Sequence, residues 1–212
     1  MQEIISTDLE VDYEATKSIN EGVDIATAND NIDQITAERM EKQSAAIAKL
    51  IDTACGVQLS KNAKKSLTGE LTEAGVTKLF NEASTEFTQN EVDTDVIKRA
   101  YVTSDIYNFL VDSKLATTAK NSTVNIDVNG LYMFKGFLLH EVPNTRFING
   151  ENAYFVADHI GKVFAGFNEY RALTENANFF GMALQSLIKY GTYVPEKNGK
   201  AIVKAKLTVP AG

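Results

Sequence analysis

The clearest periodic pattern in the chain lies in residues 29–56. Apolar side chains recur there mostly three and four positions apart, which places them on one face of a helix. Asn31 can cap the N-terminus of this helix, and Gly56 follows its last apolar position as a natural stop. We therefore predict a helix from Ile32 to Cys55, about 36 Å long at ~1.5 Å per residue. Its narrow, alanine-rich stripe is typical of a helix that packs along a sheet; the main positions are Ile32, Ile35, Met40, Ile47, Leu50 and Ile51.

A second pattern, near the C-terminus, has the two-residue period of a strand. Six of the eight even-numbered residues from Phe180 to Val194 are apolar, and Gly181 and Gly191 disfavour a helix over the same residues. We predict a long, bent strand there. After a turn at residues 196–199 the alternation resumes over residues 200–209 with lysines on one face, a pattern typical of an edge strand.

The residues between these two patterns mix helices and strands. A second helix is predicted at residues 70–83, followed by a polar linker at residues 84–95. Strand, tight turn and helix then follow at residues 99–110, where Ser104 is the expected N-cap. Further short strands are predicted at residues 124–128, 134–142, 153–157 and 163–173. The order of elements favours an α+β fold over a strict βαβ repeat.

Composition and charge exclude several classes of protein. The chain has 212 residues and a net charge of −7, which argues against a dedicated nucleic-acid binder with a basic face. Its one cysteine, Cys55, excludes an intrachain disulfide and fits a reducing compartment. The sequence contains no run of ~18 apolar residues, so no membrane span is predicted. Residues 1–28 are acidic and polar, with an alternating piece from Ile4 to Val11, and are interpreted as a segment that lies on something else.

The sequence offers few candidates for catalytic, cofactor-binding or metal-ligating residues. The sequence has no glycine-rich phosphate loop, no nucleophile elbow and no metalloprotease motif. His140 and Glu141 are neighbours on a predicted strand, so their side chains would point to opposite faces. His159 and Cys55 come from unrelated segments and do not complete a zinc ligand set. We therefore predict no catalytic, cofactor-binding or metal-ligating residue and no enzymatic activity.

The order of the pieces resembles a known family. A long amphipathic helix comes first, then the strand–turn–helix AYVTSDIYNFLVDS at residues 100–113. The strand FKGFLLHEVPN at residues 134–144 and the alternating FFGMALQSLIKYGTYVPEKNGKAIVK at residues 179–204 follow. Together they are similar to the major capsid (coat) proteins of tailed bacteriophages, whose fold is shared with bacterial encapsulin shells.

This resemblance implies a division of the chain. Residues 1–56 would hold part of a peripheral domain, with the helix as its spine. Residues 57–174 would form a mixed α/β axial domain, and residues 175–212 would return as peripheral-domain strands that pack on the spine. The family's N-terminal arm and long two-stranded loop clasp neighbouring subunits. Only some 30 residues precede the helix here, so we expect both to be absent, shortened or processed.

The resemblance also implies a function. The chain would be a structural subunit of an icosahedral phage or prophage capsid that encloses DNA, acting by self-assembly. Its partners would be copies of itself in pentamers or hexamers, packaged DNA without specific contacts, and scaffolding or portal proteins. It would reside in the virion capsid, and in the host bacterial cytoplasm during assembly.

Two alternatives stay open at this point. One is a small-molecule-binding or enzymatic α+β domain with a pocket under residues 134–142, where His140 and Glu141 would be the polar groups. The other is an encapsulin-like shell around protein cargo.

Overall fold

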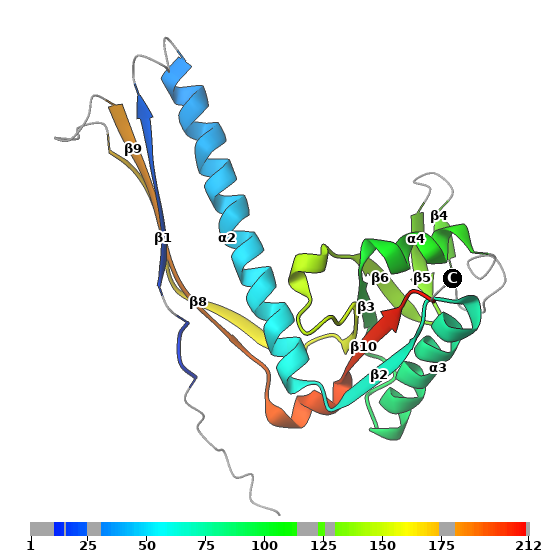
Figure 1. The fold of residues 1–212 in the computed structure, drawn as a ribbon. Helices are drawn as coiled ribbons and strands as arrows, with labels where there is room; N and C mark the ends of the chain where they lie inside the picture. The colour runs from blue at the N-terminus through cyan, green and yellow to red at the C-terminus, as the bar shows by residue number, and fades with distance from the viewer. Residues whose placement is uncertain are drawn as a thin grey trace, which may run out of the picture. The chain divides into compact units, whose positions relative to one another are not determined.

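The chain forms two compact units in the computed structural model, which describes residues 11–14, 16–24, 31–113, 123–125, 130–173 and 181–210 (Figure 1). Unit 1 is drawn from Met1–Ile51 and Val163–Tyr193, and unit 2 from Asp52–Lys162 and Val194–Gly212. These boundaries differ from the expected 1–56, 57–174 and 175–212. The first boundary moves because the polypeptide passes from unit 1 to unit 2 inside its long helix. The others move because residues 163–173 belong to unit 1 and residues 194–212 belong to unit 2.

That helix, α2, runs over Ile32–Asn62 and is 31 residues long. The predicted helix is therefore present, but the predicted stop at Gly56 is wrong. A Cβ atom at Gly56 would collide with the backbone carbonyl oxygen of Arg146, so this glycine admits a close backbone approach instead of ending the helix. Asp33 in the first turn and Lys61 in the last turn complement the helix dipole. Neither α2 nor any other described helix is long and apolar enough to cross a membrane.

Unit 1 contains a three-stranded sheet in the order β1, β9, β8, with bounds Lys17–Asp24, Gly181–Tyr193 and Lys162–Leu173. β1 is antiparallel to β9, with Lys17 opposite Ile188 and Asp24 opposite Gly181. The long strand predicted near the C-terminus is confirmed as β9. Its even-numbered residues are all buried, as the alternation predicted: Met182, Leu184, Ser186, Ile188, Tyr190 and Thr192.

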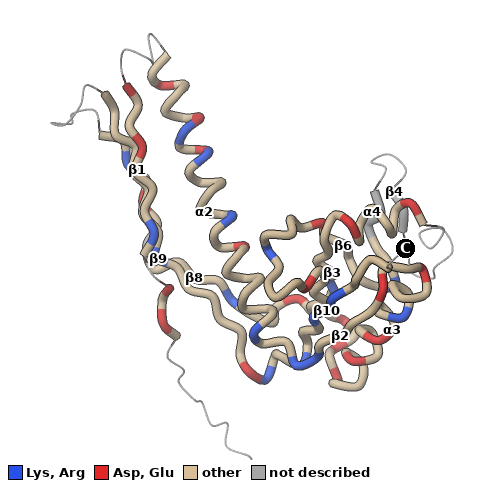
Figure 2. Tube along the Cα trace, viewed as in Figure 1, with Lys and Arg blue, Asp and Glu red and all other residues tan. Residues whose placement is uncertain are grey.

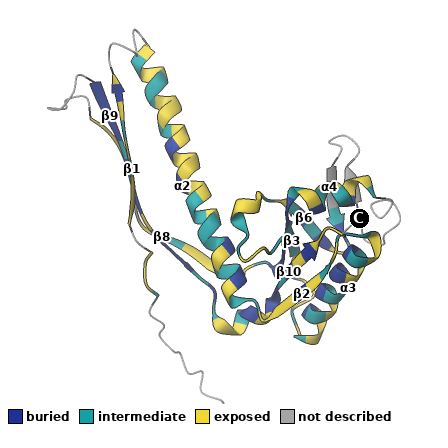
Figure 3. Cartoon of the chain, viewed as in Figure 1, coloured by how far each residue is buried: buried dark blue, intermediate teal, exposed yellow. Residues whose placement is uncertain are grey.

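The core of unit 1 lies between this sheet and α2. Val23 of β1 and Met182 and Leu184 of β9 form a buried cluster. Partly buried residues of the helix stripe pack against that cluster: Ile32, Ile35 and Met40. The predicted packing of the helix along pleated strands is thus observed, and Figure 3 shows the buried positions along β9.

Unit 2 is built on a seven-stranded mixed sheet. Its order is β2 (Lys65–Glu70), β10 (Ile202–Thr208), β7 (Ala153–Ala157), β3 (Lys98–Val102), β6 (Phe137–Glu141), β5 (Gly130–Phe134) and β4 (Thr123–Asn125). The β10–β2 and β3–β6 pairs are parallel and the other pairs are antiparallel. A mixed sheet of this kind fits the predicted α+β class.

β10 corrects two expectations. The lysine pattern predicted an edge strand, and the resemblance implied a strand that returns to the peripheral domain. β10 instead lies between β2 and β7 in unit 2. Ile202 and Val203 are fully buried on opposite faces, as an interior strand requires. Lys204 is accommodated because its ammonium group pairs with Glu151 at 2.9 Å. The pattern of lysines alone could not show that partner.

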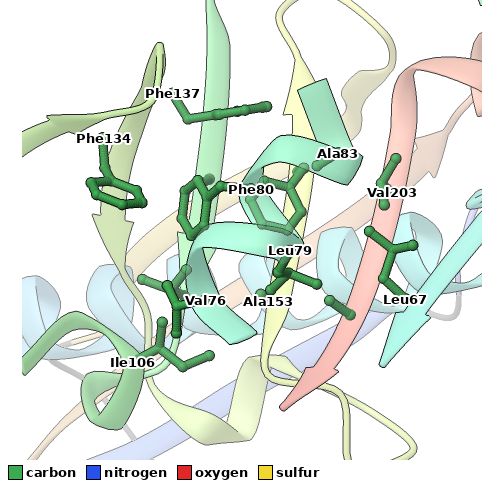
Figure 4. Close-up of a cluster of buried hydrophobic side chains, with 14 of the residues drawn as sticks. Leu67, Val76, Leu79, Phe80, Ala83, Ile106, Phe134, Phe137, Ala153 and Val203 are labelled. Atoms are coloured by element: carbon green, nitrogen blue, oxygen red, sulfur yellow. The ribbon is translucent and has the colours of Figure 1, made fainter. Parts of the chain in front are cut away.

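Helices α3 (Glu73–Gln89) and α4 (Ser104–Asp112) supply the core on one face of this sheet. Phe80 of α3 lies at its centre, edge-to-face with Phe134 and Phe155 at centroid distances of 4.8 and 4.9 Å (Figure 4). The predicted linker at residues 84–95 is wrong for its first six residues, which continue α3. Phe87 is the reason, because it is fully buried and lies 5.8 Å from the Phe137 ring.

A separate cluster covers the other face of the sheet. Tyr154, Val156, Val194 and Ile202 are buried there, with Leu59 of α2 and Phe147 packed against them. The sheet of unit 2 is therefore covered on both faces, by α3 and α4 on one and by the last part of α2 on the other.

Candidate functional site

The helix–sheet contact of unit 1 combines apolar packing with polar ties. Arg39 Nη1 donates to Glu21 Oε1 at 2.7 Å, and Gln43 Nε2 donates to Glu21 Oε2 at 3.4 Å. Thr36 Oγ1 lies 3.3 Å from the sulfur of Met182. One carboxylate of β1 therefore holds two successive turns of α2, in addition to the apolar cluster.

The structure places the six predicted spine positions along α2 in two groups. Ile32, Ile35 and Met40 contact the apolar cluster of the sheet. Ile47 is buried, with 6% of its surface exposed, and Leu50 and Ile51 are half-buried. Together these positions form the less exposed side of a helix whose other positions are mostly in contact with solvent.

A polar cluster in unit 2 was missed by the sequence analysis. Glu151, in the loop before β7, accepts hydrogen bonds from Ser60 of α2 at 2.9 Å and from Tyr154 of β7 at 2.6 Å. Lys204 of β10 also pairs with Glu151 and donates to the Ser60 carbonyl oxygen at 3.1 Å. These four residues are 144 positions apart at the extremes, and no motif links them. The cluster ties the last turns of α2 to two strands of the sheet.

The electrostatics of this cluster favour an ionised carboxylate. Burial alone would raise the pKa of Glu151, but hydrogen bonds from Tyr154, Lys204 and Ser60 outweigh it and lower that pKa. Burial and the same contact with Glu151 raise the pKa of Tyr154 far above its ordinary value. Tyr154 thus stays protonated as a donor. The arrangement holds α2, β7 and β10 in a fixed geometry.

His140 belongs to a second polar cluster on β3 and β6. The Arg99 guanidinium makes a two-pronged contact with Asp158, at 2.5 and 3.0 Å, and a third contact with His140 Nε2 at 2.9 Å. Because a guanidinium only donates, Nε2 must accept and His140 is neutral. Tyr101 stacks on the imidazole at 5.3 Å between centroids. Burial and the adjacent Arg99 lower the pKa of His140, with Asp158 opposing them.

The pocket hypothesis for residues 134–142 gains no support from this geometry. Phe134, Phe137 and Leu139 are buried in the aromatic core, whereas Glu141 is exposed and His140 faces Arg99. Two hollows on the described surface lie elsewhere, along the exposed side of α3 and on the sheet of unit 1. His140 and Glu141 therefore do not form the polar pair of a binding pocket.

The remaining candidates for chemistry stay separate. Cys55 is half-buried, and burial, with Asp52 nearby, raises the pKa of its thiol. Within the described ranges, no three His, Cys, Asp or Glu side chains gather closely enough to hold a metal ion. Figure 2 shows Lys and Arg interspersed with Asp and Glu along the described elements, without a basic stripe on one of them.

Comparison with known proteins identifies the fold. No protein-family model and no curated protein matches this chain, but solved structures share its fold. A structure from Mycobacterium phage Che8 is 21% identical, with a TM-score of 0.67 over 94% of this chain and 76% of that one. The mature capsid of bacteriophage PhiM1 is 14% identical, with a TM-score of 0.71 over 99% of this chain and 77% of that one. The capsid of cyanophage P-SCSP1u is 11% identical, with a TM-score of 0.71 over 96% and 78%.

The chain therefore has the fold of these phage capsid structures over nearly its whole length. The predicted fold class is confirmed: an α+β chain with a long helix on a sheet and a mixed α/β unit. The resemblance to the tailed-phage major capsid proteins is confirmed at the level of the fold.

Proposed function

We propose that this protein is a structural subunit of an icosahedral phage or prophage capsid and that it acts by self-assembly rather than catalysis. The observation that carries the proposal is the likeness to phage capsid structures over nearly the whole chain, not over one isolated unit. The polar clusters support it, because each fixes one element against another and none is arranged as a nucleophile, base or metal site.

We propose that the two units are the two domains that the resemblance implies, with the boundaries that the structure gives. Unit 1, with its sheet and the first part of α2, would be the peripheral domain, and unit 2 would be the axial domain. The spine positions Ile32, Ile35, Met40, Ile47, Leu50 and Ile51 would keep α2 rigid in a shell. Rigidity matters there because closed symmetry requires every copy to present the same contact surfaces.

The partners follow from the same proposal. Copies of the chain would form pentamers or hexamers, packaged DNA would lie inside without specific contacts, and scaffolding or portal proteins would join during assembly. A net charge of −7 suits a wall that encloses DNA without binding it tightly. The protein would reside in the virion capsid, and in the host bacterial cytoplasm before assembly.

Light scattering on the purified chain tests this function. We expect a mass several times 23.2 kDa that increases with protein concentration. Assembled material should contain nucleic acid when it is isolated from phage-producing cells, whereas an encapsulin-like shell would contain protein cargo. A strict monomer at every concentration, with a melting temperature that rises when a metabolite is added, would instead favour the small-molecule-binding alternative.

A further inference from the structure

Two glycines on neighbouring strands of unit 1 leave a notch in its sheet. A Cβ atom at Gly166 of β8 would lie 2.6 Å from the ring of Tyr13. A Cβ atom at Gly191 of β9 would collide with the ring of Phe164 and lie 3.2 Å from the carbonyl oxygen of Asp12. Any side chain at either position would therefore displace an aromatic ring. We call Gly166, Gly191, Phe164 and Lys189 the aromatic notch.

These glycines are required for space and not for backbone freedom. The glycines with positive φ in the described chain are Gly136 and Gly150, so Gly166 and Gly191 have backbones that any residue could adopt. A glycine in a strand interior weakens the strand, and a covering aromatic side chain compensates for the missing packing. The notch is thus a surface shaped to receive an aromatic ring.

Tyr13 fills the notch from the segment that precedes β1, which we call the strap (residues 12–14; Figure 1). Its ring meets Phe164 edge-to-face, with 5.2 Å between centroids, and Lys189 Nζ lies 4.7 Å from its centroid as a cation–π contact. The Glu14 amide donates to the Tyr190 carbonyl oxygen at 2.8 Å. The strap therefore continues along β9 in the same direction as β1.

The strap is held less firmly than the strand that follows it. β1 pairs with β9 through eight residues, from Lys17 to Asp24. In the strap, Tyr13 keeps 44% of its surface exposed although its ring is the principal anchor. Segments with little buried surface and few backbone bonds open at a lower free energy than the core around them.

We propose that the aromatic notch is a binding site for an extended segment that runs antiparallel to β9 and carries one tyrosine. Its occupant is the chain's own strap, which detaches while the three-stranded sheet stays folded. Opening removes the Tyr13 ring from Gly166, Phe164 and Lys189, while the Phe164 ring still covers Gly191. The open notch therefore accepts the same segment from solution. This inference concerns unit 1 alone and does not depend on the proposed function.

Hydrogen exchange tests whether the strap opens separately. In the full-length chain, Tyr13→Ala should speed exchange of the Glu14 amide about tenfold, the factor expected for the loss of one ring contact and one cation–π contact. Amides of β1 such as Ile19 should exchange at the unaltered rate. Tyr13→Phe, which keeps the ring, is the matched control and should resemble the unaltered chain. If Glu14 and Ile19 amides accelerate together in Tyr13→Ala, the strap is part of β1 and the proposal fails.

A peptide tests whether the notch accepts a segment from solution. The probe is a labelled peptide of residues 9–17, LEVDYEATK, added to the full-length Tyr13→Ala chain and followed by fluorescence anisotropy. It should bind about tenfold more tightly than the same peptide with alanine in place of tyrosine. The difference should vanish when Gly166→Val is added to the chain, or Gly166→Ala if the valine variant does not fold by circular dichroism. Equal binding of the two peptides, or no binding of either, would overturn the proposal.

Discussion

Glu151 is the residue through which α2, β7 and β10 are joined in unit 2. Its side chain is 8% exposed and that of Lys204 is 23% exposed, so both charges are largely withdrawn from water. Such a pair contributes little by itself relative to apolar packing, but loss of one partner leaves the other charge half-buried and unpaired. The cluster is therefore more important for fixing the helix than for net stability.

The first prediction concerns this carboxylate. Glu151→Gln should lower the free energy of unfolding of unit 2 by about 1–3 kcal/mol, because the neutral amide no longer compensates the Lys204 ammonium group. Chemical denaturation monitored by circular dichroism measures the loss. Lys204→Met provides the control: in a double-mutant cycle the Gln substitution should cost much less in the Met background. Equal costs in both backgrounds would mean that the pair is not coupled.

The second prediction concerns pH. The pKa of His140 is lowered in the folded chain, so the folded state binds this proton less readily than the unfolded state. The stability from neutral His140 is present in full above about pH 6.5, the ordinary pKa of histidine, and is lost as the pH falls below it. The free energy of unfolding should therefore decrease between pH 7 and pH 5.5. His140→Gln, whose amide oxygen can accept from Arg99, should show a shallower decrease, and an identical slope in both proteins would refute the assignment.

At the level of single residues, the sequence predicted burial better than it predicted partners. The alternation in residues 180–194 identified the buried face of β9 correctly, because burial follows the two-residue period directly. The contacts of Lys204, Glu151 and Arg99 depend on which strands become neighbours. That information is absent from local spacing, so both polar clusters escaped the sequence analysis.

Among the elements, α2 shows how a local rule is overridden by packing. Glycine in a helix interior is about 0.5–1 kcal/mol less favourable than alanine, which made Gly56 a reasonable stop. The approach of the Arg146 backbone reverses that preference. Tertiary contacts beyond residue 56, including Leu59 in the apolar cluster under the sheet, extend the helix to Asn62.

The third prediction follows from this contact. Gly56→Ala should destabilise unit 2 by about 1–3 kcal/mol, the range for overpacking, although alanine favours a helix. Ser44→Ala, at an exposed position of the same helix, is the control and should leave stability unchanged or slightly higher. Thermal denaturation of both variants makes the comparison. A Gly56→Ala protein that melts above the unaltered chain would show that Arg146 does not constrain the helix.

The fourth prediction concerns the sheet beneath α2 in unit 1. Leu184 is fully buried in the apolar cluster, whereas Leu187 is half-buried and lines the hollow on the sheet. Leu184→Ala should cost about 2–5 kcal/mol, in the range for truncation of a buried leucine. Leu187→Ala should cost clearly less. Similar losses from the two substitutions would contradict the assignment of the helix-facing side of β9.

The identity of the long elements could be predicted from sequence, but the pairing of the last strand could not. Both α2 and β9 carry one period over many residues, so their type was evident. β10 is short, and its alternation fits an edge strand or an interior strand equally well until its neighbours are known. Its placement between β2 and β7 depends on pairings across more than 130 residues of sequence for β2 and about 50 for β7.

At the scale of the whole molecule, we propose that this fold serves to build a closed shell. The similarity to phage capsids extends over both units, which is expected if both contribute to contacts between copies. Fold alone does not determine function, so assembly itself has to be observed.

Electron microscopy of the concentrated full-length chain measures this most directly. We expect five- or six-membered rings, or closed particles of uniform diameter with icosahedral symmetry, in which each subunit can be fitted by units 1 and 2. A field of single 23.2 kDa particles at every concentration, or irregular aggregates without symmetry, would contradict the proposed shell function.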